Sequence, residues 1–326
     1  MMQKSDGMNY APKGNLVYDP DPSKVDKFVS TYPEVMVAHS LEEILNDEKV
    51  MLVAAAAIPS ERGPLGLRVM DSGKDYVTDK APFTTLMQLE AARTKVAETG
   101  RKYAVYYSER LHVESSVYAE QLIKQGAIGR VLQVIGLGPH RINAKSRPDW
   151  FFEKKKFGGI LCDIGSHQIE QFLQFTGAKD AEVVHSKIAN YNYPQYPNFE
   201  DFGDATLIGD NGATGYFRVD WMTPDGLSTW GDGRMTILGS EGYIELRKYV
   251  DIARDRTSDH VYLVNQDGEQ HFAVNGKVGF PYFGQLILDC LNRTEDAMTQ
   301  EHAFKAAELC LIAQRDAITI TTSEKQ

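Results

Sequence analysis

The first third of the chain alternates short apolar segments with segments of helical pattern. Strands are predicted at 15–19, 35–39, 50–58, 75–78 and 102–108, with helices at 23–31, 40–49, 65–72 and 84–98 between them. The segment 50–58 is continuously apolar, which is typical of a strand buried on both faces. Regular alternation of strand and helix predicts a parallel sheet with helices on both faces, the doubly wound architecture.

From about residue 109 the pattern changes. Turn sequences separate pairs of strand-like segments, which predicts hairpins and therefore antiparallel pairing. The predicted elements are a helix at 114–125, a strand at 130–137, hairpins at 205–208/214–221, 235–238/243–246 and 261–264/271–274, and helices at 282–292 and 301–320. We therefore expect a Rossmann-like α/β domain at residues 1–108 and an α+β domain with a large, mostly antiparallel sheet at 109–326.

Composition narrows the class of protein. The 326 residues are 42% hydrophobic and 25% charged, as in ordinary globular proteins, and the net charge of −10 argues against a nucleic-acid partner. The longest apolar run, 50–58, is too short to cross a bilayer. Cys162, Cys290 and Cys310 are odd in number and far apart, so no disulfide framework is expected. These features predict a cytoplasmic protein without a membrane partner.

One short segment carries a candidate proton-transfer pair. Within 158–167, Asp163 and His167 stand four residues apart at the start of a predicted helix, and they share one helical face if the helix begins by Asp163. A carboxylate beside an imidazole can orient the ring and stabilise its charged form. The alternative is a helix N-cap at Asp163 and an ordinary first-turn residue at His167, and spacing alone favours this alternative. A metal site from these two residues and His185 is not expected, because no closed ligand set is present.

A second segment adds to this pair. The predicted strand 75–78 ends in a turn, Asp79-Lys80-Ala81-Pro82, which places a lysine at a strand end. Together with Gly-Gly-x-x-x-Asp-x-x-x-His at 158–167, it resembles the Gfo/Idh/MocA family of NAD(P)-dependent oxidoreductases. In that family a Glu-Lys-Pro turn ends a strand of the dinucleotide-binding domain, and the second motif opens a helix of the substrate domain. The resemblance extends from about residue 16 to 321, including the turn and strand at 126–131 and the terminal helix.

The resemblance implies an activity and roles for the catalytic residues. It implies hydride transfer between a nicotinamide cofactor and a secondary alcohol or ketone of a sugar, polyol or cyclitol. Lys80 would bind the substrate hydroxyl, His167 would be the general base, and Asp163 would orient His167 or bind a hydroxyl. Two alternatives stay open: a non-catalytic binding or regulatory protein that has lost dinucleotide affinity, and an NAD-dependent glycosidase of the same family.

The resemblance also implies binding residues and partners. Cofactor contacts would come from Asp19, Ile58, Pro59, Lys80 and Pro82, and substrate contacts from Tyr107, Arg110, His140 and Trp150. A carboxylate at Asp19 favours NAD over NADP, although NADP stays open and Asp19 is equally explained as a turn residue of 19–22. The small-molecule substrate is not identified by the sequence. A homodimer or homotetramer is expected.

The dinucleotide fingerprint is missing. No G-x-G-x-x-G occurs in the chain, and only 18 residues precede Asp19, whereas a strand, glycine turn, helix and second strand need about 30. Residues 1–8 would be the tail of the first helix. Three explanations are considered: an upstream start codon, residues omitted from the sequence, or a natural truncation. We favour the first two, because the chemical residues are retained and a parallel sheet without its central strand exposes unpaired edges.

Overall fold

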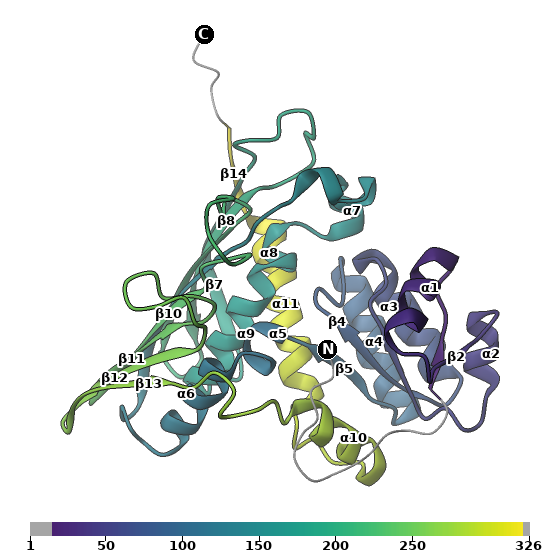
Figure 1. Cartoon of the computed structure of the whole chain (residues 1–326), viewed down its shortest axis with the longest axis horizontal. Helices are drawn as coiled ribbons and strands as arrows, with labels where there is room; N and C mark the ends of the chain where they lie inside the picture. Colours follow the sequence, from purple (N-terminus) through teal and green to yellow (C-terminus); the bar gives the residue numbers. More distant parts are fainter. Residues whose placement is uncertain (1–14, 322–326) are drawn as a thin grey trace.

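The computed structural model describes residues 15–321, which form two lobes (Figure 1). The helix predicted within residues 1–8 lies outside this range. The N-terminal lobe is built from parallel strands and helices in alternation, as the sequence pattern predicts. Its elements are β1 (Leu16–Val17), α1 (Pro22–Thr31), β2 (Met36–Val37), α2 (Leu41–Asn46), β3 (Leu52–Ala55), α3 (Pro59–Asp71), β4 (Asp75–Asp79), α4 (Leu86–Thr99) and β5 (Tyr103–Tyr106).

The parallel strands of this lobe form two separate sheets. β1 pairs only with β2, and the second sheet has the order β3-β4-β5. Within residues 15–321 no strand joins β1 to β3, so each of these two strands has one edge without a strand partner. The predicted strand 50–58 is shorter in the structure, since Pro59 already begins α3. The helix predicted at 65–72 is the second half of that longer helix.

The C-terminal lobe contains a nine-stranded sheet of order β13-β12-β11-β10-β6-β9-β8-β7-β14. The three predicted hairpins are confirmed as β8/β9, β10/β11 and β12/β13, and all three are antiparallel. β6 and β9 pair in parallel at the centre. The strands are β6 (Val131–Pro139), β7 (Ala181–Ala189), β8 (Phe202–Gly209), β9 (Thr214–Asp220), β10 (Arg234–Gly239), β11 (Gly242–Arg247), β12 (His260–Asn265), β13 (Gly268–Ala273) and β14 (Ile318–Ile320).

Helices cover one face of this sheet and connect it to the other lobe. In Figure 1 α8, α9 and α11 lie on the side of the sheet that faces the N-terminal lobe. The helices of this half are α5 (Ser108–Leu111), α6 (Glu114–Lys124), α7 (Lys154–Phe157), α8 (Ile160–Asp163), α9 (Gly165–Thr176), α10 (Tyr282–Asn292) and α11 (Gln300–Asp316), with short 3-10 turns at Ala144–Ser146 and Asp149–Phe152. The sequence predicts one helix at 301–320. The structure ends that helix at Asp316, and β14 follows and pairs with β7.

The last two helices hold the lobes together. Tyr107 at the end of β5 donates a hydrogen bond to the carbonyl of Ala303 in α11 at 3.1 Å. From α10, Tyr282 donates to the carbonyl of Val105 in β5 at 3.1 Å. These contacts join the three-stranded parallel sheet to the C-terminal lobe, and they fix the end of β4 relative to the sheet domain.

Candidate active site

Two residues that are far apart in the sequence meet between the lobes. Lys80 follows β4, at the carboxyl end of the parallel strands, and Asp163 is the last residue of α8. The Lys80 Nζ atom lies 2.5 Å from Asp163 Oδ1, and the two side chains keep 15% and 13% of their surface exposed. Both side chains therefore keep a small part of their surface open. The structure therefore forms an ammonium–carboxylate pair with one partner from each lobe.

A buried arginine on α3 holds the turn that carries Lys80. The Arg62 guanidinium donates through Nη1 to the carbonyls of Asp79, Lys80 and Ala81, and through Nε to the carbonyl of Ala57 at 2.7 Å. One side chain thus ties the segment after β3 to the segment after β4. Sequence analysis missed Arg62, although its position three residues after the proline that begins α3 is a usable signal.

The Gly158–Gly159 pair allows α8 to begin close to the polar side chains of Gln314 and Glu200. Gly159 has φ 94°, and a Cβ at this position would lie 2.2 Å from Gln314 side-chain atoms. The Gln314 Oε1 atom accepts from Leu161 N at 2.9 Å, and Glu200 accepts from Ile160 N at 2.9 Å. The first N–H groups of α8 are therefore satisfied from outside the helix, which fixes the position of Asp163.

Asp163 and His167 are not hydrogen-bonded to each other in the described structure. α8 ends at Asp163 and α9 begins at Gly165, so the two residues belong to different helical segments. The Asp163 carboxylate contacts Lys80 instead. Burial opposes its ionisation, but the ion pair with Lys80 holds the pKa of Asp163 below its usual value. The expectation that Asp163 orients His167 is therefore wrong for this structure.

His167 lies in a buried polar cluster behind this pair. Its side chain is almost fully buried, and its Nδ1 atom has no hydrogen-bond partner among the described residues. Burial lowers the pKa of His167 to about 3, although the negative charge of Glu109 opposes this shift. At neutral pH the ring is uncharged and keeps a nitrogen lone pair, which is the state that can accept a proton.

Glu109 is the central anion of this cluster and was missed by sequence analysis. Its carboxylate lies 3.4 Å from Lys248 Nζ, 3.5 Å from His140 Nε2 and 3.1 Å from Gln168 Nε2. Burial opposes ionisation of Glu109, but the surrounding positive groups, with Lys248 first among them, together outweigh burial, and the pKa of Glu109 falls to about 2. A negative charge thus lies close to both histidines. Its position directly after the α/β pattern, next to the predicted Arg110, is the signal that could have found it.

Two of the predicted substrate residues, His140 and Trp150, pack against aromatic side chains. His140 directly follows β6 and packs edge-on against Trp221 and Trp230, with ring centroids 5.4 and 4.4 Å apart. Burial lowers the pKa of His140. Trp150 lies on the 3-10 turn that precedes α7, half-buried against Phe151.

Tyr107 and Arg110 are buried away from this site, which corrects their prediction as substrate contacts. The Tyr107 hydroxyl is occupied by its bond to Ala303. Arg110 is held by two carboxylates, with Nε 2.7 Å from Glu170 and Nη1 3.0 Å from Glu120. Both side chains therefore stabilise the packing between α5, α6, α9 and α11.

The predicted cofactor residues lie along the carboxyl ends of the two small sheets. Asp19 follows β1, and its carboxylate accepts from Asp21 N at 2.9 Å, as expected for a turn residue. Ile58 precedes the buried Pro59 at the start of α3. Pro82 is buried behind the Lys80 turn, and its carbonyl accepts from Tyr103 at 3.3 Å.

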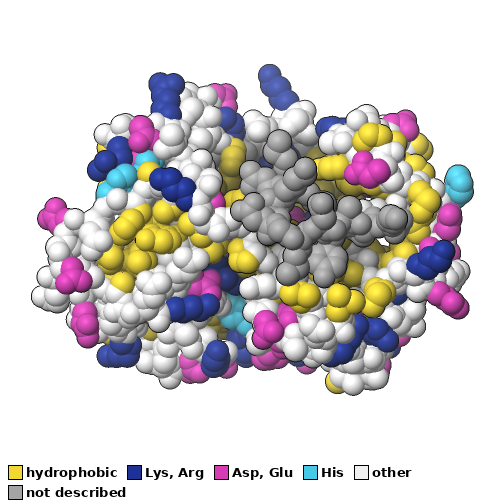
Figure 2. Space-filling model, turned by 60° about the horizontal axis from the view of Figure 1, so that its bottom comes forward, with side chains coloured by type: hydrophobic (Ala, Val, Ile, Leu, Met, Phe, Trp, Pro, Cys, Tyr) yellow, Lys and Arg dark blue, Asp and Glu magenta, His cyan; other side chains and the backbone are white. Residues whose placement is uncertain are grey.

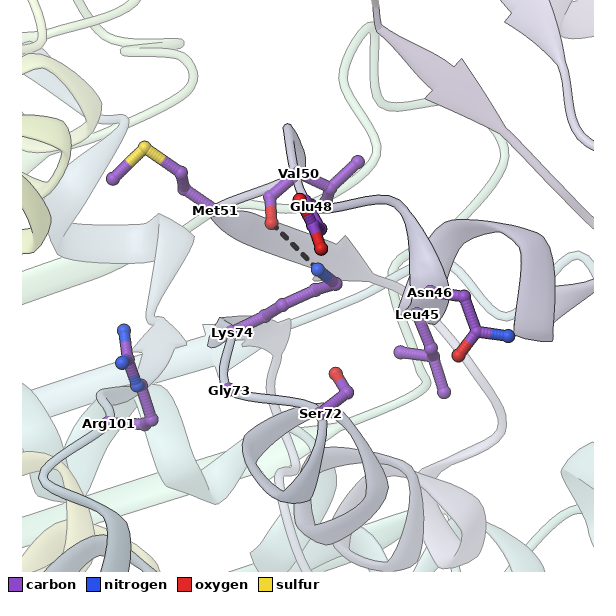
Figure 3. A pocket seen from close by; sticks show the side chains of 9 residues that line it. All are labelled: Leu45, Asn46, Glu48, Val50, Met51, Ser72, Gly73, Lys74 and Arg101. Atoms are coloured by element: carbon purple, nitrogen blue, oxygen red, sulfur yellow. Dashed lines mark hydrogen bonds between the residues drawn. The ribbon is translucent and has the colours of Figure 1, made fainter.

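A cavity in the N-terminal lobe lies away from these residues. It has a volume of about 430 Å³ and is lined by residues from the amino ends of β3 and β4, the opposite edge of the sheet from Lys80 (Figure 3). The lysine in its wall, Lys74, donates to the carbonyls of Asp47 and Val50 at 2.7 and 3.0 Å. Because this ammonium caps the ends of the chain segments around it, Lys74 has a structural role.

Within residues 15–321, no group of three or more His, Cys, Asp or Glu side chains is arranged to hold a metal ion. In the same range, none of the helices combines the length and apolar character needed to span a membrane.

Comparison with known proteins identifies the family. The GFO/IDH/MocA C-terminal domain matches residues 117–245. A crystal structure of a candidate oxidoreductase from Erwinia carotovora atroseptica SCRI1043 is 55% identical, with a TM-score of 0.91 over 94% of this chain and 92% of that one. This chain belongs to the Gfo/Idh/MocA family.

More distant relatives have named activities. The scyllo-inositol 2-dehydrogenase (NAD(+)) of Bacillus subtilis is 27% identical over 62% of this chain and 56% of its own length. The NADP(+) enzyme of the same organism is 24% identical over 49% and 44%. Levoglucosan dehydrogenase in complex with NADH has the same fold, with a TM-score of 0.73 at 17% identity over 93% of this chain and 88% of that one. The chain spans only about half the length of the curated relatives it matches.

Residues 15–321 supply only part of a dinucleotide site. The turn with Lys80 lies where the strands of a parallel sheet end, which is where such folds bind ligands. A glycine-rich cradle for the pyrophosphate is not present in residues 15–321, and within this range β1 and β3 are not joined by a strand. The described residues therefore do not fit a whole dinucleotide.

Proposed function

We propose that this chain carries the alcohol-activating site of an oxidoreductase that acts on a CH–OH group, or on the matching ketone, of a sugar, polyol or cyclitol. Support comes from the dehydrogenases among the relatives, whose names give inositol, xylose and levoglucosan as substrates. The observation that carries the proposal is the 2.5 Å contact between Lys80 and Asp163 from opposite lobes, with a buried His167 within electrostatic reach of Lys80.

Lys80 and Asp163 would act on the substrate oxygen. The Lys80 ammonium can donate a hydrogen bond to a hydroxyl and stabilise the alkoxide that forms as its proton leaves. Asp163 holds the ammonium in place and has a second carboxylate oxygen that can accept from a neighbouring hydroxyl. A vicinal diol fits this pair of groups, because one hydroxyl meets a donor while the other meets an acceptor.

His167 would accept the proton. The ring is neutral at pH 7, because burial lowers its pKa to about 3. The imidazolium that forms is stabilised by the nearby Glu109 carboxylate, which is itself kept ionised by Lys248. Glu109 thus supplies the counter-charge that a buried histidine needs in order to act as a base.

The cofactor proposed from the family is NAD, with NADP as the alternative, and it would take up or supply the hydride. Asp19 would meet the adenosine ribose, while Ile58, Pro59 and Pro82 would lie beside the nicotinamide end. No proton-transfer step above depends on these contacts.

A second candidate function is a binding protein without catalysis. The specific observation in its favour is the division of the parallel strands of residues 15–321 into two sheets. Such a protein would keep the Lys80–Asp163 pair for recognition of a hydroxylated ligand.

Titration of the purified chain with NADH and NADPH, followed by nicotinamide fluorescence, separates these two functions. Nucleotide binding, together with turnover of a sugar or polyol, would establish the oxidoreductase if Lys80→Ala removes the turnover. Lys155→Ala, on the exposed surface of α7, is the matched control. A folded chain that binds neither nucleotide at millimolar concentration would instead establish the binding protein.

We also propose that the chain forms a homo-oligomer through the open face of the nine-stranded sheet. Large hydrophobic side chains are exposed on neighbouring strands of this sheet, and Ile135 and Tyr216 are directly paired across β6 and β9. Figure 2 shows hydrophobic side chains gathered on the half of the molecule that carries the sheet. The exposed residues are Ile135, Val184, Ile208, Tyr216, Leu238 and Tyr243. Light scattering after size-exclusion chromatography tests this: Tyr216→Glu should yield monomers, and a wild-type monomer would contradict the proposal.

A further inference from the structure

Arg147 stacks on two aromatic rings, those of Phe151 and Trp221. Its guanidinium carbon lies 4.4 Å from the ring centroid of Phe151 and 5.0 Å from that of Trp221. Its Nε atom donates to the carbonyl of Ile142 at 2.8 Å. Two aromatic rings and one hydrogen bond therefore fix the plane of a half-buried guanidinium.

The two Nη atoms of Arg147 have no hydrogen-bond or ion-pair partner among residues 15–321. Within residues 15–321, neither Nη atom donates a hydrogen bond, and no carboxylate lies within 4.0 Å of the guanidinium. The neighbouring Arg141 is different, because its Nη2 atom donates to the carbonyls of Pro224 and Leu227 at 2.8 and 2.6 Å. Arg141 therefore holds the loop at 224–227, whereas the Nη atoms of Arg147 stay available to a ligand.

The topology places Arg147 beside Trp221, which lies against the predicted substrate residue His140. β6 and β9 are parallel and end in register at Pro139 and Asp220, so His140 and Trp221 emerge side by side from the sheet. Arg147 stacks on that Trp221 ring. Burial lowers the pKa of Arg147 and the negative charge of Asp163 opposes this, so Arg147 also lies within electrostatic reach of Asp163.

Among residues 15–321, Arg147 differs from the neighbouring lysines because no carboxylate is paired with it. Lys80 is paired with Asp163, and Lys248 is paired with Glu109. A cation that is partly removed from water without a counter-ion is costly, and a ligand that brings the anion removes this cost. A guanidinium fork also matches carboxylate and phosphate oxygens in a bidentate manner.

We propose that the substrate is an acidic sugar or polyol, whose carboxylate or phosphate group binds the Nη atoms of Arg147 while one of its hydroxyls meets Lys80. This inference rests on the proposed function for the hydroxyl chemistry, and it adds the class of substrate. Arg147 is then a specificity-determining residue that positions the substrate and takes no part in proton transfer.

Isothermal titration of the intact chain without added nucleotide tests the inference. The probes are D-gluconate, D-glucose 6-phosphate and the neutral polyol D-glucitol. The first two distinguish a carboxylate from a phosphate ligand, and glucitol reports on binding through hydroxyls alone. We expect one of the anions to bind at least about 10-fold more tightly than glucitol, equivalent to about 1.4 kcal/mol.

The variants are Arg147→Gln, Arg147→Lys and the matched control Arg254→Gln. Arg254 is also stacked on an aromatic ring, with its guanidinium carbon 5.6 Å from the Tyr262 centroid, but it is exposed and outside the site. Arg147→Gln should abolish the preference for the anion, Arg147→Lys should retain part of it, and Arg254→Gln should leave it unchanged. Melting temperatures of all variants show whether each is folded.

Two outcomes overturn the inference: glucitol and both anions bind equally or not at all, or the preference survives in Arg147→Gln. Failure of the proposed function looks different. In that case the anion binds through Arg147, but neither NAD nor NADP supports turnover of any probe. The substrate class would then stand for a binding protein instead of an enzyme.

Discussion

The two lobes contain sheets of very different continuity, although the site needs both. In the C-terminal lobe nine strands form one sheet, and β8 and β9 are paired over seven residue positions. In the N-terminal lobe the parallel strands are divided, and β1 and β2 are paired over only two positions. The β3-β4-β5 sheet, however, is tied to the other lobe through Tyr107, Tyr282 and an ion pair from Arg293 to Asp75 at 2.7 Å. The position of Lys80 thus depends on contacts between the lobes more than on the width of its own sheet.

Amide hydrogen exchange tests the difference between the sheets most directly. The Met36 and Ala38 amides each donate across the β1–β2 pair, to the carbonyls of Asn15 and Val17. Because so few interactions hold this pair, we expect both amides to exchange at least about 1,000-fold faster than Ala205 and Leu207 in β8. Similar protection measured by mass spectrometry or NMR would show that the small sheet is as stable as the large one.

Removing the catalytic group of either lobe should have effects of similar size. We expect Lys80→Ala and His167→Ala each to lower kcat by about 100- to 10,000-fold, because each removes a group that handles the hydroxyl proton or its charge. The assay is steady-state turnover of the sugar or polyol found with NAD or NADP. His185→Ala, on the exposed side of β7, is the control. Unchanged kcat in either variant would remove that residue from the mechanism.

Ion pairs of the two lobes should differ strongly in their contribution to stability. Lys248 and Glu109 keep only 1% and 3% of their side-chain surface, whereas Arg68 and Glu42 in the N-terminal lobe keep 54% and 63%. We expect Lys248→Met to lower the free energy of unfolding by about 3–5 kcal/mol, because it leaves a buried charge, and Arg68→Met by less than about 1 kcal/mol. Urea unfolding measures both. The double variant Lys248→Met, Glu109→Gln should be more stable than Lys248→Met alone, because it removes the unpaired charge. Equal stability of the two would show that this charge does not cause the loss in Lys248→Met.

A smaller effect than the loss in Lys248→Met is a dependence of stability on pH that arises in the C-terminal lobe. Burial lowers the folded-state pKa of His167 to about 3, whereas the unfolded-state value is near 6.5. Above pH 6.5 the ring is neutral in both states, and its contribution to stability is fully present. As the pH falls from 6.5 toward 3, only the unfolded chain binds the proton, so stability is lost, by about 2 kcal/mol at pH 5.

His167→Gln should reduce this loss, and His39→Gln on the exposed surface of the N-terminal lobe should not. Free energies of unfolding of the three proteins at pH 7 and pH 5 provide the comparison. An equal loss in wild type and His167→Gln would mean that other groups cause the acid sensitivity.

The sequence pattern predicts the two-lobe architecture because period and turn signals are local. Strand–helix alternation and three hairpin turns are each determined by a few neighbouring residues, and the structure confirms them. The predicted element boundaries are wrong where long-range packing determines the secondary structure. β14 forms only because β7 offers it an edge, and α3 begins at Pro59 because β3 is shorter than its apolar run. β7 itself was not predicted at all.

The same division holds for the site. The sequence by itself determined which residue types stand at strand and helix ends: Lys80 after β4, and Asp163 with His167 at the Gly-Gly segment. Only the tertiary structure decided that Asp163 pairs with Lys80 and not with His167, that Glu109 and Lys248 form a buried pair next to the histidines, and that Arg110 belongs to the packing. The physical reason is that a charge buried in the fold needs a partner in space, and such partners come from chain segments about 80 to 140 residues apart, beyond the range of any local pattern.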